Sequence, residues 1–355
     1  MRLPFAHSGS RTLQQAWLTR GSLAVALLPL SAIFVLLSGI RRLLYQQGLL
    51  VARKLGVPVV VVGNLIAGGA GKTPTVIALV ALLRRHGYTP GILSRGYGRR
   101  GKGETLDVGA ATPARECGDE PKLLYLRTGA PVMVGRNRVA AGAALLHAHP
   151  EVDVIVSDDG LQHLALARDA QVIVFDERGV GNGWLLPSGP LRESLSPSVP
   201  ARTVVLYNAA SASTPWPGSL GMRSLAGIVD LASWWQGRHA SLGPLQALRA
   251  KPLWAAAGIA NPDRFFALLR GHGLVFEALP LPDHCSFDTL PWPASAADVL
   301  VTEKDAVKID PGRIGATRVW VAALDFQTSP AFEADLIALL PARRLQGTDH
   351  GSPPA

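Results

Sequence analysis

A glycine-rich loop between an apolar run and a helix-like segment constrains the fold of this chain more than any other feature. Residues 57–62 read VPVVVV, and a run without polar alternation is typical of a strand buried on both faces. Residues 68–73 (GGAGKT) follow, and residues 73–87 have the pattern of a helix that ends in arginines and a glycine. A strand, loop and helix in this order predict a phosphate-binding loop.

The loop offers the groups that a nucleoside triphosphate needs. Its glycines let backbone N–H groups surround the phosphates, and the helix N-terminus adds a positive dipole. We expect Lys72 to bridge the β- and γ-phosphates and Thr73 to bind Mg²⁺ through its hydroxyl group. The match is incomplete, because Ile66 stands where the full G-x-x-x-x-G-K-[ST] pattern has its first glycine. The predicted nucleotide-binding residues are Ile66, Ala67, Gly68, Gly69, Ala70, Gly71, Lys72 and Thr73.

Further apolar runs extend the same fold. Residues 153–159 (DVIVSDD) predict a buried strand that ends in acids, and residues 171–175 and 203–207 predict two more strands. This alternation favours an α/β fold of the P-loop NTPase type, with a parallel sheet and helices on both faces. Ligands of such sheets bind at the carboxyl ends of the strands, so Asp158 and Asp159 are candidate Mg²⁺ ligands. Each acid could instead cap the segment that follows it.

A segment rich in Ser, Pro and Gly at residues 209–220 predicts a linker. A second set of apolar runs follows it and predicts a smaller α/β domain. The predicted parts are a membrane anchor helix at 1–45, a phosphate-loop core at 46–208, the smaller α/β domain at 209–343 and a disordered tail at 344–355.

Residues 22–40 contain no charged side chain over 19 positions, and arginines flank them on both sides. At about 1.5 Å per residue, a helix of this length just crosses a bilayer core of about 30 Å. Basic residues are denser after the run than before it, which favours a cytoplasmic body. Pro29 and the marginal length leave open a helix that lies in the membrane interface. A cleaved signal peptide and a buried core helix also fit the run, though less well.

The charge distribution also points to an anionic partner. The net charge is +9, yet residues 1–103 contain 14 Lys and Arg and no acid. Nucleic acid, phospholipid or a phosphorylated lipid would suit such a front end. Hydrophobic residues make up 48% and charged residues 17%, which excludes a disordered chain. The only cysteines, Cys117 and Cys285, cannot form a disulfide framework, so we expect reduced thiols.

A phosphate loop alone fits a GTPase, a partitioning ATPase or a kinase, and a kinase also needs a group that accepts the proton of its acceptor hydroxyl. Residues 117–121 (CGDEP) offer Asp119, and residues 281–285 (LPDHC) offer His284 in a short loop. An Asp held by a His would make such a base. From the residues alone this pairing is only a hypothesis, because loop acids are usually solvated and loop histidines are usually just exposed.

Eight motifs occur together in one order: VVGNLIAGGAGKTP (61–74), SRGYGR (94–99), GDEP (118–121), VGRNR (134–138), SDDGLQH (157–163), PSGPLRE (187–193), PDH (282–284) and TEKDAVK (302–308). Together they resemble the tetraacyldisaccharide 4′-kinase family of the lipid A pathway. The resemblance runs from about residue 20 to residue 340, and eight ordered motifs make it much more specific than the loop alone.

The resemblance implies transfer of the ATP γ-phosphate to the 4′-hydroxyl of a tetraacylated glucosamine disaccharide 1-phosphate, with ATP and Mg²⁺ bound. It also implies an enzyme at the bacterial inner membrane whose catalytic body faces the cytoplasm. Asp119 matches the family's base, His284 its partner and Lys72 its phosphate-binding lysine. Glu193 matches a Mg²⁺ ligand beside Asp158 and Asp159; without the family it reads as a solvated loop acid.

Basic residues near the predicted site are candidate contacts for the lipid substrate. Arg136 and Arg138 lie two apart after an apolar run, so on a strand they would share a face and clamp a phosphate. Arg95 and Tyr97 lie in a basic, glycine-rich loop that would contact the sugar headgroup or anionic lipid. A solvated basic face would show the same pattern. We expect a monomer that contacts membrane lipid and no nucleic acid.

Two other functions fit parts of the sequence. A membrane-bound P-loop ATPase that acts as a switch or recruits a partner would not need an Asp–His pair in a second domain. A soluble metabolite kinase with a cleaved signal is disfavoured by the uncharged run and its flanking arginines. A zinc site built from Cys117, Asp119, His284 and Cys285 is disfavoured because the spacing matches no zinc signature.

Overall fold

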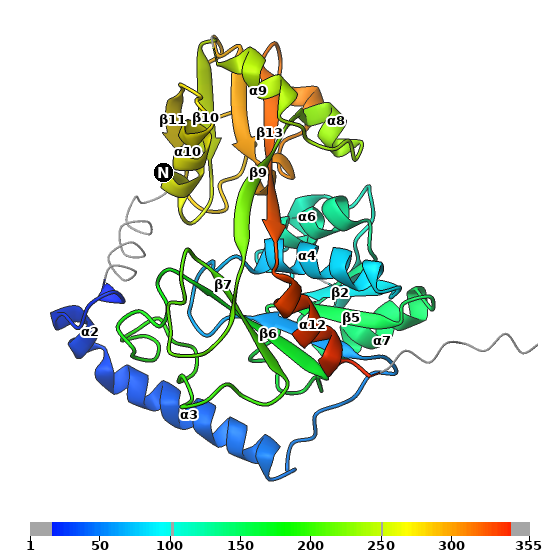
Figure 1. The fold of residues 1–355 in the computed structure, drawn as a ribbon, viewed down its shortest axis with the longest axis vertical. Coiled ribbons are helices and arrows are strands. Elements are labelled where there is room, and N and C mark those ends of the chain that lie inside the picture. Colours follow the sequence, from blue (N-terminus) through cyan, green and yellow to red (C-terminus); the bar gives the residue numbers. More distant parts are fainter. Residues whose placement is uncertain (1–15, 101–102, 250, 342–355) are drawn as a thin grey trace, which may run out of the picture.

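The computed structural model describes residues 16–100, 103–249 and 251–341, so the predicted tail and the first part of the predicted anchor lie outside it. Two sheets make up the body of the molecule and lie one above the other in Figure 1. The larger has the strand order β3-β4-β2-β5-β1-β6-β7-β8, and the smaller has the order β11-β10-β12-β13-β9. We call the regions around these sheets the large lobe and the small lobe.

The large lobe is built mostly from parallel strands. Its strands are β1 (Val59–Gly63), β2 (Pro90–Ser94), β3 (Thr105–Asp107), β4 (Val132–Gly135), β5 (Val154–Asp158), β6 (Ala170–Asp176), β7 (Thr203–Asn208) and β8 (Ser219–Leu220). Its helices are α4 (Lys72–Arg85), α5 (Ala114–Cys117), α6 (Asp119–Thr128), α7 (Arg138–Ala148) and α12 (Pro330–Leu339). All pairings are parallel except that of β3 with β4.

The continuous valine run of β1 is explained by its burial on both faces. Val60 and Val62 face one core with residues of α4 and α12, while Val59 and Val61 face another core with residues of α7. Successive side chains of a strand alternate between faces, so an unbroken apolar run fits only a strand covered twice. The predicted parallel α/β sheet with helices on both faces is confirmed.

The small lobe repeats the architecture on five strands. They are β9 (Met222–Asp230), β10 (Leu253–Ala257), β11 (Glu277–Pro280), β12 (Asp298–Thr302) and β13 (Arg318–Gln327). The helical segments are α8 (Leu231–Trp235), α9 (Gly243–Leu248), α10 (Pro262–Gly271), α11 (Glu303–Ala306) and a 3₁₀ turn at Pro311–Arg313. One of its cores also contains Ala114 and Leu123 of α5 and α6, so the two lobes share packed apolar surface.

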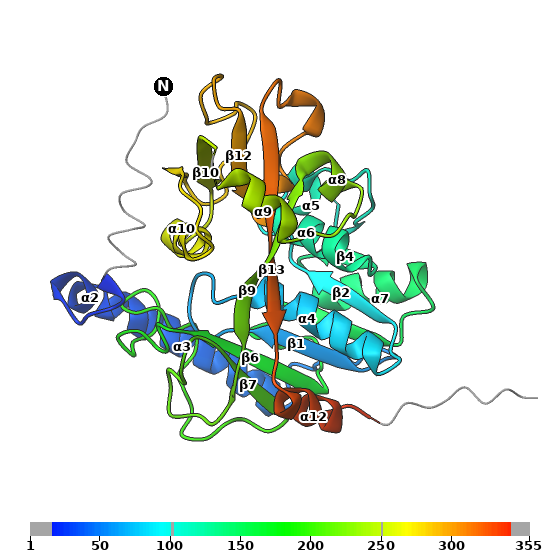
Figure 2. The same cartoon turned by 45° about the horizontal axis from the view of Figure 1, so that its top comes forward.

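The chain passes between the lobes on two long strands. β9 and β13 pair antiparallel from Met222–Gln327 to Asp230–Trp320, and β9 runs from the large lobe to the small one while β13 returns (Figures 1 and 2). The lobes are therefore less separate in sequence than a boundary at residue 209 predicts. Residues 219–220 form β8 beside β7, and α12 returns after the small lobe to pack on the core of the large sheet.

The uncharged run forms two helices rather than one. α2 (Ser22–Ala26) and α3 (Leu28–Gln46) meet at Leu27, just before Pro29, which cannot donate a backbone hydrogen bond within a helix. α3 is long and apolar enough to cross a membrane, and almost all of it is uncovered by the rest of the protein. Ser31 is the buried contact point, where its hydroxyl group donates to Leu185 O.

The exposed side of α3 gives the first prediction. Ile33 is 55% and Leu37 is 62% exposed, and burial of such a side chain in lipid contributes about 1.5–3 kcal/mol. We expect the double variant Ile33→Asp and Leu37→Asp to bind phospholipid vesicles about tenfold more weakly or worse, measured by co-sedimentation. Val275→Asp is the matched control, because Val275 is 77% exposed on the small lobe. Unchanged binding of the double variant would contradict the role of α3.

Candidate active site

The phosphate loop (residues 68–73) depends on a glycine in a left-handed conformation. Gly71 has φ 87° and directly precedes the first residue of α4, Lys72. A Cβ atom at Gly71 would lie 2.1 Å from Nδ2 of Asn208, which is closer than any real contact. Both the backbone conformation and the space therefore require glycine here.

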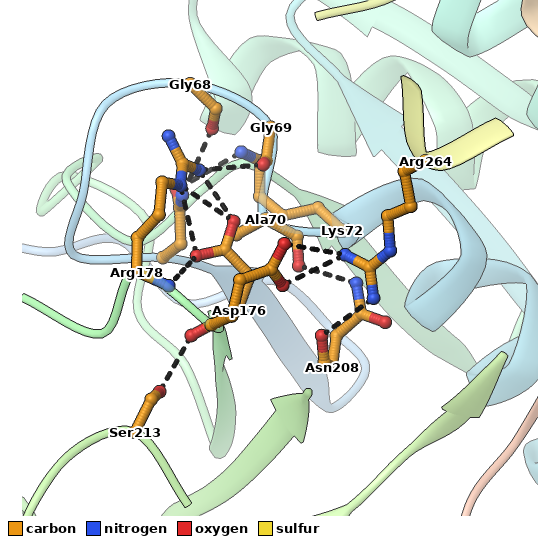
Figure 3. Close-up of polar contacts among 11 residues, drawn as sticks. Gly68, Gly69, Ala70, Lys72, Asp176, Arg178, Asn208, Ser213 and Arg264 are labelled. Atoms are coloured by element: carbon orange, nitrogen blue, oxygen red, sulfur yellow. Dashed lines mark hydrogen bonds and ion pairs between the residues drawn. The ribbon is translucent and has the colours of Figure 1, made fainter. Parts of the chain in front are cut away.

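Side chains from three strand ends hold the loop in place (Figure 3). Asn208 at the end of β7 donates to Ala70 O, and Asn64 after β1 donates to Gly68 O. Arg178 donates to Gly69 O at 2.8 Å while two of its nitrogens bind Asp176 at the end of β6. The backbone carbonyl groups of Gly68, Gly69 and Ala70 thus each accept a hydrogen bond from a side chain.

Ile66 and Ala67, the first two residues of the predicted nucleotide site, pair with the segment around Leu191. Ile66 is fully buried and forms a β-bridge with Leu191, and Ala67 donates its N–H to Pro190 O. A residue paired in this way needs no special backbone freedom, which explains why Ile66 stands where the full motif has glycine. Ile66 nevertheless lines the cleft described below, so it stays a predicted nucleotide contact beside the loop at residues 68–73.

Lys72 points toward the edge of the sheet where β1 and β5 end. Its ammonium group donates to Asn64 Oδ1 at 3.1 Å and lies 3.6 Å from Asp159 Oδ1. Asp159 also accepts from Arg192 at 2.8 Å and has a positive φ of 47°, which is unusual for a residue with a side chain. Burial alone would raise the pKa of Asp159, but Lys72 and Arg192 outweigh it and hold that pKa below its ordinary value.

Asp158 differs sharply from its neighbour. It ends β5, is 3% exposed, and accepts from Ser94 Oγ at 3.3 Å with Oδ2 only. Its Oδ1 atom is buried without a hydrogen-bond partner. Burial, together with the charges of Glu120 and Asp159, raises the pKa of Asp158 to about 7. An unpartnered buried carboxylate oxygen beside a second acid is a fit for a hard cation such as Mg²⁺.

Glu193, the third predicted metal ligand, is bound elsewhere. Its two oxygens accept from Gln162 at 2.8 Å and from Arg42 of α3 at 2.7 Å. Among the described residues, no group of three His, Cys, Asp or Glu side chains is placed to hold a metal ion. The structure therefore keeps Glu193 apart from Asp158 and Asp159 and connects it to the N-terminal helix.

The structure brings Asp119 and His284 together across the two lobes. Nδ1 of His284 lies 3.1 Å from Oδ2 of Asp119, although 165 residues separate them in sequence. Asp119 is the first residue of α6, where the helix dipole favours a negative charge. His284 has φ 59°, which is strained for a residue with a side chain and is typical of functional positions.

Two lysines of the small lobe surround this pair, and the sequence assigned them no role. Lys304 lies 3.5 Å from Glu120 and 3.3 Å from Asp283, so it joins the residues that follow Asp119 and precede His284. Lys308 donates to the fully buried Asp305 at 3.0 Å and lies 3.9 Å from Asp119 Oδ2. Both belong to the TEKDAVK segment, whose presence among the eight motifs was the available signal.

The basic loop after β2 lies against the same pair. The Tyr97 ring lies 5.9 Å from the ring of His284, and its side chain is 73% exposed. Gly96 and Tyr97 contact the backbone before Asp119, because a Cβ on Gly118 would lie 3.1 Å from Tyr97 O. Arg95 is also exposed, so this loop presents an aromatic and a cationic side chain to solvent beside the Asp–His pair.

The predicted strand for Arg136 and Arg138 is wrong. β4 ends at Gly135, and Asn137 caps α7 by accepting from Val139 N and Ala140 N, so Arg138 is the first helical residue. The two side chains do not share a face: Arg136 is exposed, whereas Arg138 is 2% exposed. The guanidinium group of Arg138 donates to Gly135 O and to Asp158 O, which fixes the end of β5.

Both cysteines are free thiols, with Cys117 buried and Cys285 half-buried. Burial raises the pKa of the Cys117 thiol to about 11, so it stays protonated at neutral pH. An inert, protonated thiol is a poor metal ligand and does not favour zinc.

A cleft of about 1300 Å³ lies between the lobes and opens over the phosphate loop. The loop and the end of β7 line one wall, and Asn261, Arg264 and Phe265 of the small lobe line the other. Its size is ample for one nucleotide, since small-molecule ligands typically occupy pockets of about 300–1,000 Å³.

Comparison with known proteins identifies the family. The family model described as Tetraacyldisaccharide-1-P 4'-kinase matches residues 23–341. The chain belongs to this family. It is 56% identical to the tetraacyldisaccharide 4'-kinase of Methylibium petroleiphilum over 91% of this chain and 92% of that one. It is 54% identical to that of Leptothrix cholodnii over 94% and 96% of the two chains.

A solved structure supports both the predicted fold and the predicted binding of ATP. LpxK from Aquifex aeolicus, described as in complex with ATP, superposes with a TM-score of 0.73 at 26% identity and covers 90% of this chain and 100% of that one. The predicted family, the predicted kinase activity and the predicted use of ATP are thereby confirmed.

The unusual state of Asp158 gives a stability prediction. Because its pKa is raised, the folded state holds this proton more tightly than the unfolded chain, so the contribution of Asp158 to stability is lost as pH rises from about 4 to about 7. Without nucleotide or Mg²⁺, Asp158→Asn should therefore raise the melting temperature at pH 8 and much less at pH 5.

The melting experiment needs a control variant and a comparison with Mg²⁺. Asp335→Asn removes an exposed acid of α12 and should leave the melting temperature unchanged at both pH values. Mg²⁺ at pH 8 should stabilise the wild type more than Asp158→Asn. If Asp158→Asn melted at a lower temperature than wild type at pH 8, the ionised carboxylate of Asp158 would not destabilise the fold, and the prediction would be wrong.

Proposed function

We propose that this chain transfers the γ-phosphate of ATP to the 4′-hydroxyl of tetraacyldisaccharide 1-phosphate, with Asp119 as the base. The observation that carries the proposal is the 3.1 Å contact between Asp119 and His284, next to Glu120, which lines the nucleotide cleft. A nucleotide switch needs no such pair, since it has no acceptor hydroxyl to deprotonate.

The phosphate loop supplies positioning and charge. In phosphoryl transfer the developing charge spreads over the γ-phosphoryl oxygens, and catalysis is mostly electrostatic. Lys72, now shared between Asn64 and Asp159, is within reach of that group and stabilises it. For Lys72 to contact the γ-phosphate of ATP, its ion pair with Asp159 has to open.

Thr73, Asp158 and Asp159 would hold Mg²⁺ beside the phosphates. The fit rests on the unpartnered Oδ1 of Asp158 and on the adjacent carboxylate of Asp159. The ion would neutralise charge on the phosphate oxygens. Glu193 joins this set only after it leaves Arg42, so we assign it a secondary role that couples the site to α3.

Asp119 takes the proton of the attacking hydroxyl, and His284 holds its carboxylate in place. The ammonium group of Lys308 lies 3.9 Å from the same carboxylate. Since His284 comes from the small lobe, the base is complete only when the lobes are in contact.

The exposed groups around the pair suit an anionic lipid headgroup. Arg95, Tyr97 and Arg136 are exposed and would contact the sugar and its phosphate. Arg138 is buried and donates to Gly135 O and Asp158 O, so it supports the end of β5 instead. Because exposure of acyl chains to water costs about 0.8 kcal/mol per CH₂, the enzyme must reach the lipid at the membrane, and α3 provides the attachment. We place the catalytic body at the cytoplasmic face of the bacterial inner membrane, as a monomer.

Lipid phosphorylation is the direct test. Purified protein is incubated in detergent with labelled ATP, Mg²⁺ and tetraacyldisaccharide 1-phosphate, and the bisphosphorylated lipid is separated and counted. Lys72→Ala is the reference for loss of the phosphate site. Hydrolysis of ATP without a labelled lipid would favour the switch function instead.

The base assignment has its own prediction. Asp119→Asn keeps the size of the side chain and removes its basicity, so kcat should fall about 10²–10⁴-fold while ADP binding is unchanged. Asp288→Asn, an acid in the loop after His284, is the matched control. A variant at Asp119 that retains wild-type kcat would exclude this residue as the base.

A further inference from the structure

One cation in the nucleotide cleft stands apart from the others. Arg85, Arg127, Arg178, Arg264 and Lys304 line the cleft, and each has an acid within 4.0 Å. Arg223 of β9 lines it too, yet in the described part of the chain no acid lies within 4.0 Å of it and its side chain makes no hydrogen bond. Its Nε atom is also shielded from solvent.

Arg223 lies against the phosphate loop. Its Nη2 atom is 2.9 Å from the position that a Cβ atom on Gly71 would occupy. Burial and the like charge of Arg264 lower the pKa of Arg223 to about 10, although the more distant acids Glu177 and Asp176 act in the opposite direction, so Arg223 is still charged at neutral pH. Arg223 is half-buried, its Nε atom is shielded from solvent, and among the described residues no nitrogen of its guanidinium group has a hydrogen-bond or ion-pair partner. An anionic ligand that reached this group would therefore gain a charge-assisted hydrogen bond without breaking an existing one.

The N-terminus of α4 lacks one hydrogen-bond donor that the guanidinium group of Arg223 can replace. The first four N–H groups of a helix have no partner within it and form the anion site of a phosphate loop. In α4 these belong to the N-cap Gly71 and to residues 72–74, because Thr75 makes the first bond within the helix, to Gly71 O. Pro74 has no N–H, so the helix offers three of the four donors.

We propose that Arg223 binds the α- and β-phosphates of the nucleotide and supplies the donor that Pro74 lacks. The strand order β5-β1-β6-β7 decides which phosphates. Asp158 ends β5 on one side of the loop, whereas Asn208 ends β7 and lies with Arg223 on the other. The reacting γ-phosphate belongs near Asp158 and the base Asp119, so the opposite side receives the rest of the chain. This inference rests on the proposed function, in which the γ-phosphate is transferred with Asp119 as the base.

Arg223 also sits where the two lobes are joined. It is the second residue of β9, pairs with Phe326 of β13, and follows β8 of the large sheet by only a few residues. A phosphate bound to Arg223 therefore connects the phosphate loop with the strands that carry the small lobe. Binding energy at this point would hold the lobes in register before the acceptor arrives.

Calorimetric titration with Mg·ADP, in the absence of lipid, tests the proposal. Arg223→Met keeps the apolar stem and removes the charge, and its Kd for Mg·ADP should rise about tenfold or more. In the kinase assay KM for ATP should rise by a similar factor with kcat largely kept, because the α- and β-phosphates are bound in the ground state and the transition state alike. Arg238→Ala, an exposed arginine of the same lobe, is the matched control.

A melting curve without nucleotide separates binding from a structural role. Because Arg223 has no ion pair among the described residues and lies near the like charge of Arg264, the melting temperature of Arg223→Met should equal or exceed that of wild type, while the stabilisation by Mg·ADP shrinks. If this variant does not fold, Arg223→Lys decides, with an intermediate loss of affinity expected. A Kd within twofold of wild type in a folded variant would overturn the proposal. Failure to phosphorylate lipid alongside Arg223-dependent ADP binding would instead overturn only the proposed acceptor.

Discussion

The contact between α6 and α11 is the interaction on which the site depends. α6 belongs to the large lobe and begins with Asp119, whereas α11 belongs to the small lobe and begins with Glu303. Arg127 pairs with the buried Glu303, which also accepts from Trp234 Nε1 and from Leu324 N. A buried carboxylate with three donors cannot lose one cheaply, so the contact is held firmly. At the other end of α6, the same packing of the lobes places His284 against Asp119.

This dependence explains what the sequence can and cannot predict. Local sequence patterns predict the valine strand, the phosphate loop and the acidic end of β5. Burial on both faces of a strand requires consecutive apolar residues, and a tight loop requires glycines, so both features can be read from neighbouring residues. The pairing of Asp119 with His284 leaves no local mark, and only the resemblance to a family suggested it. Its geometry is set by packing of Leu123 and Ala114 into the core of the other lobe, which no window of sequence contains.

Where the predictions failed, a neighbouring group decided the outcome. Arg138 was expected on a strand, but the side chain of Asn137 caps a helix at that point and turns the arginine inward. The boundary at residue 209 was expected from composition, but β8 adds a short strand to the large sheet inside that segment. Arg223 carries no motif at all, and only its position beside Gly71 reveals it.

The charges of the site show how the protein tolerates so many cations before a nucleotide arrives. Lys72 is balanced by Asp159, Arg178 by Asp176 and Arg264 by Glu177, and each pair must loosen or turn when phosphate enters. A magnesium nucleotide brings charges of both signs, so it can take the carboxylates and the cations at once, and the exchange costs little. Among the described residues, Arg223 has no acid within 4.0 Å, so under its proposed role it could bind phosphate without breaking an ion pair. The paired cations of the cleft would then exchange partners, whereas Arg223 would gain one.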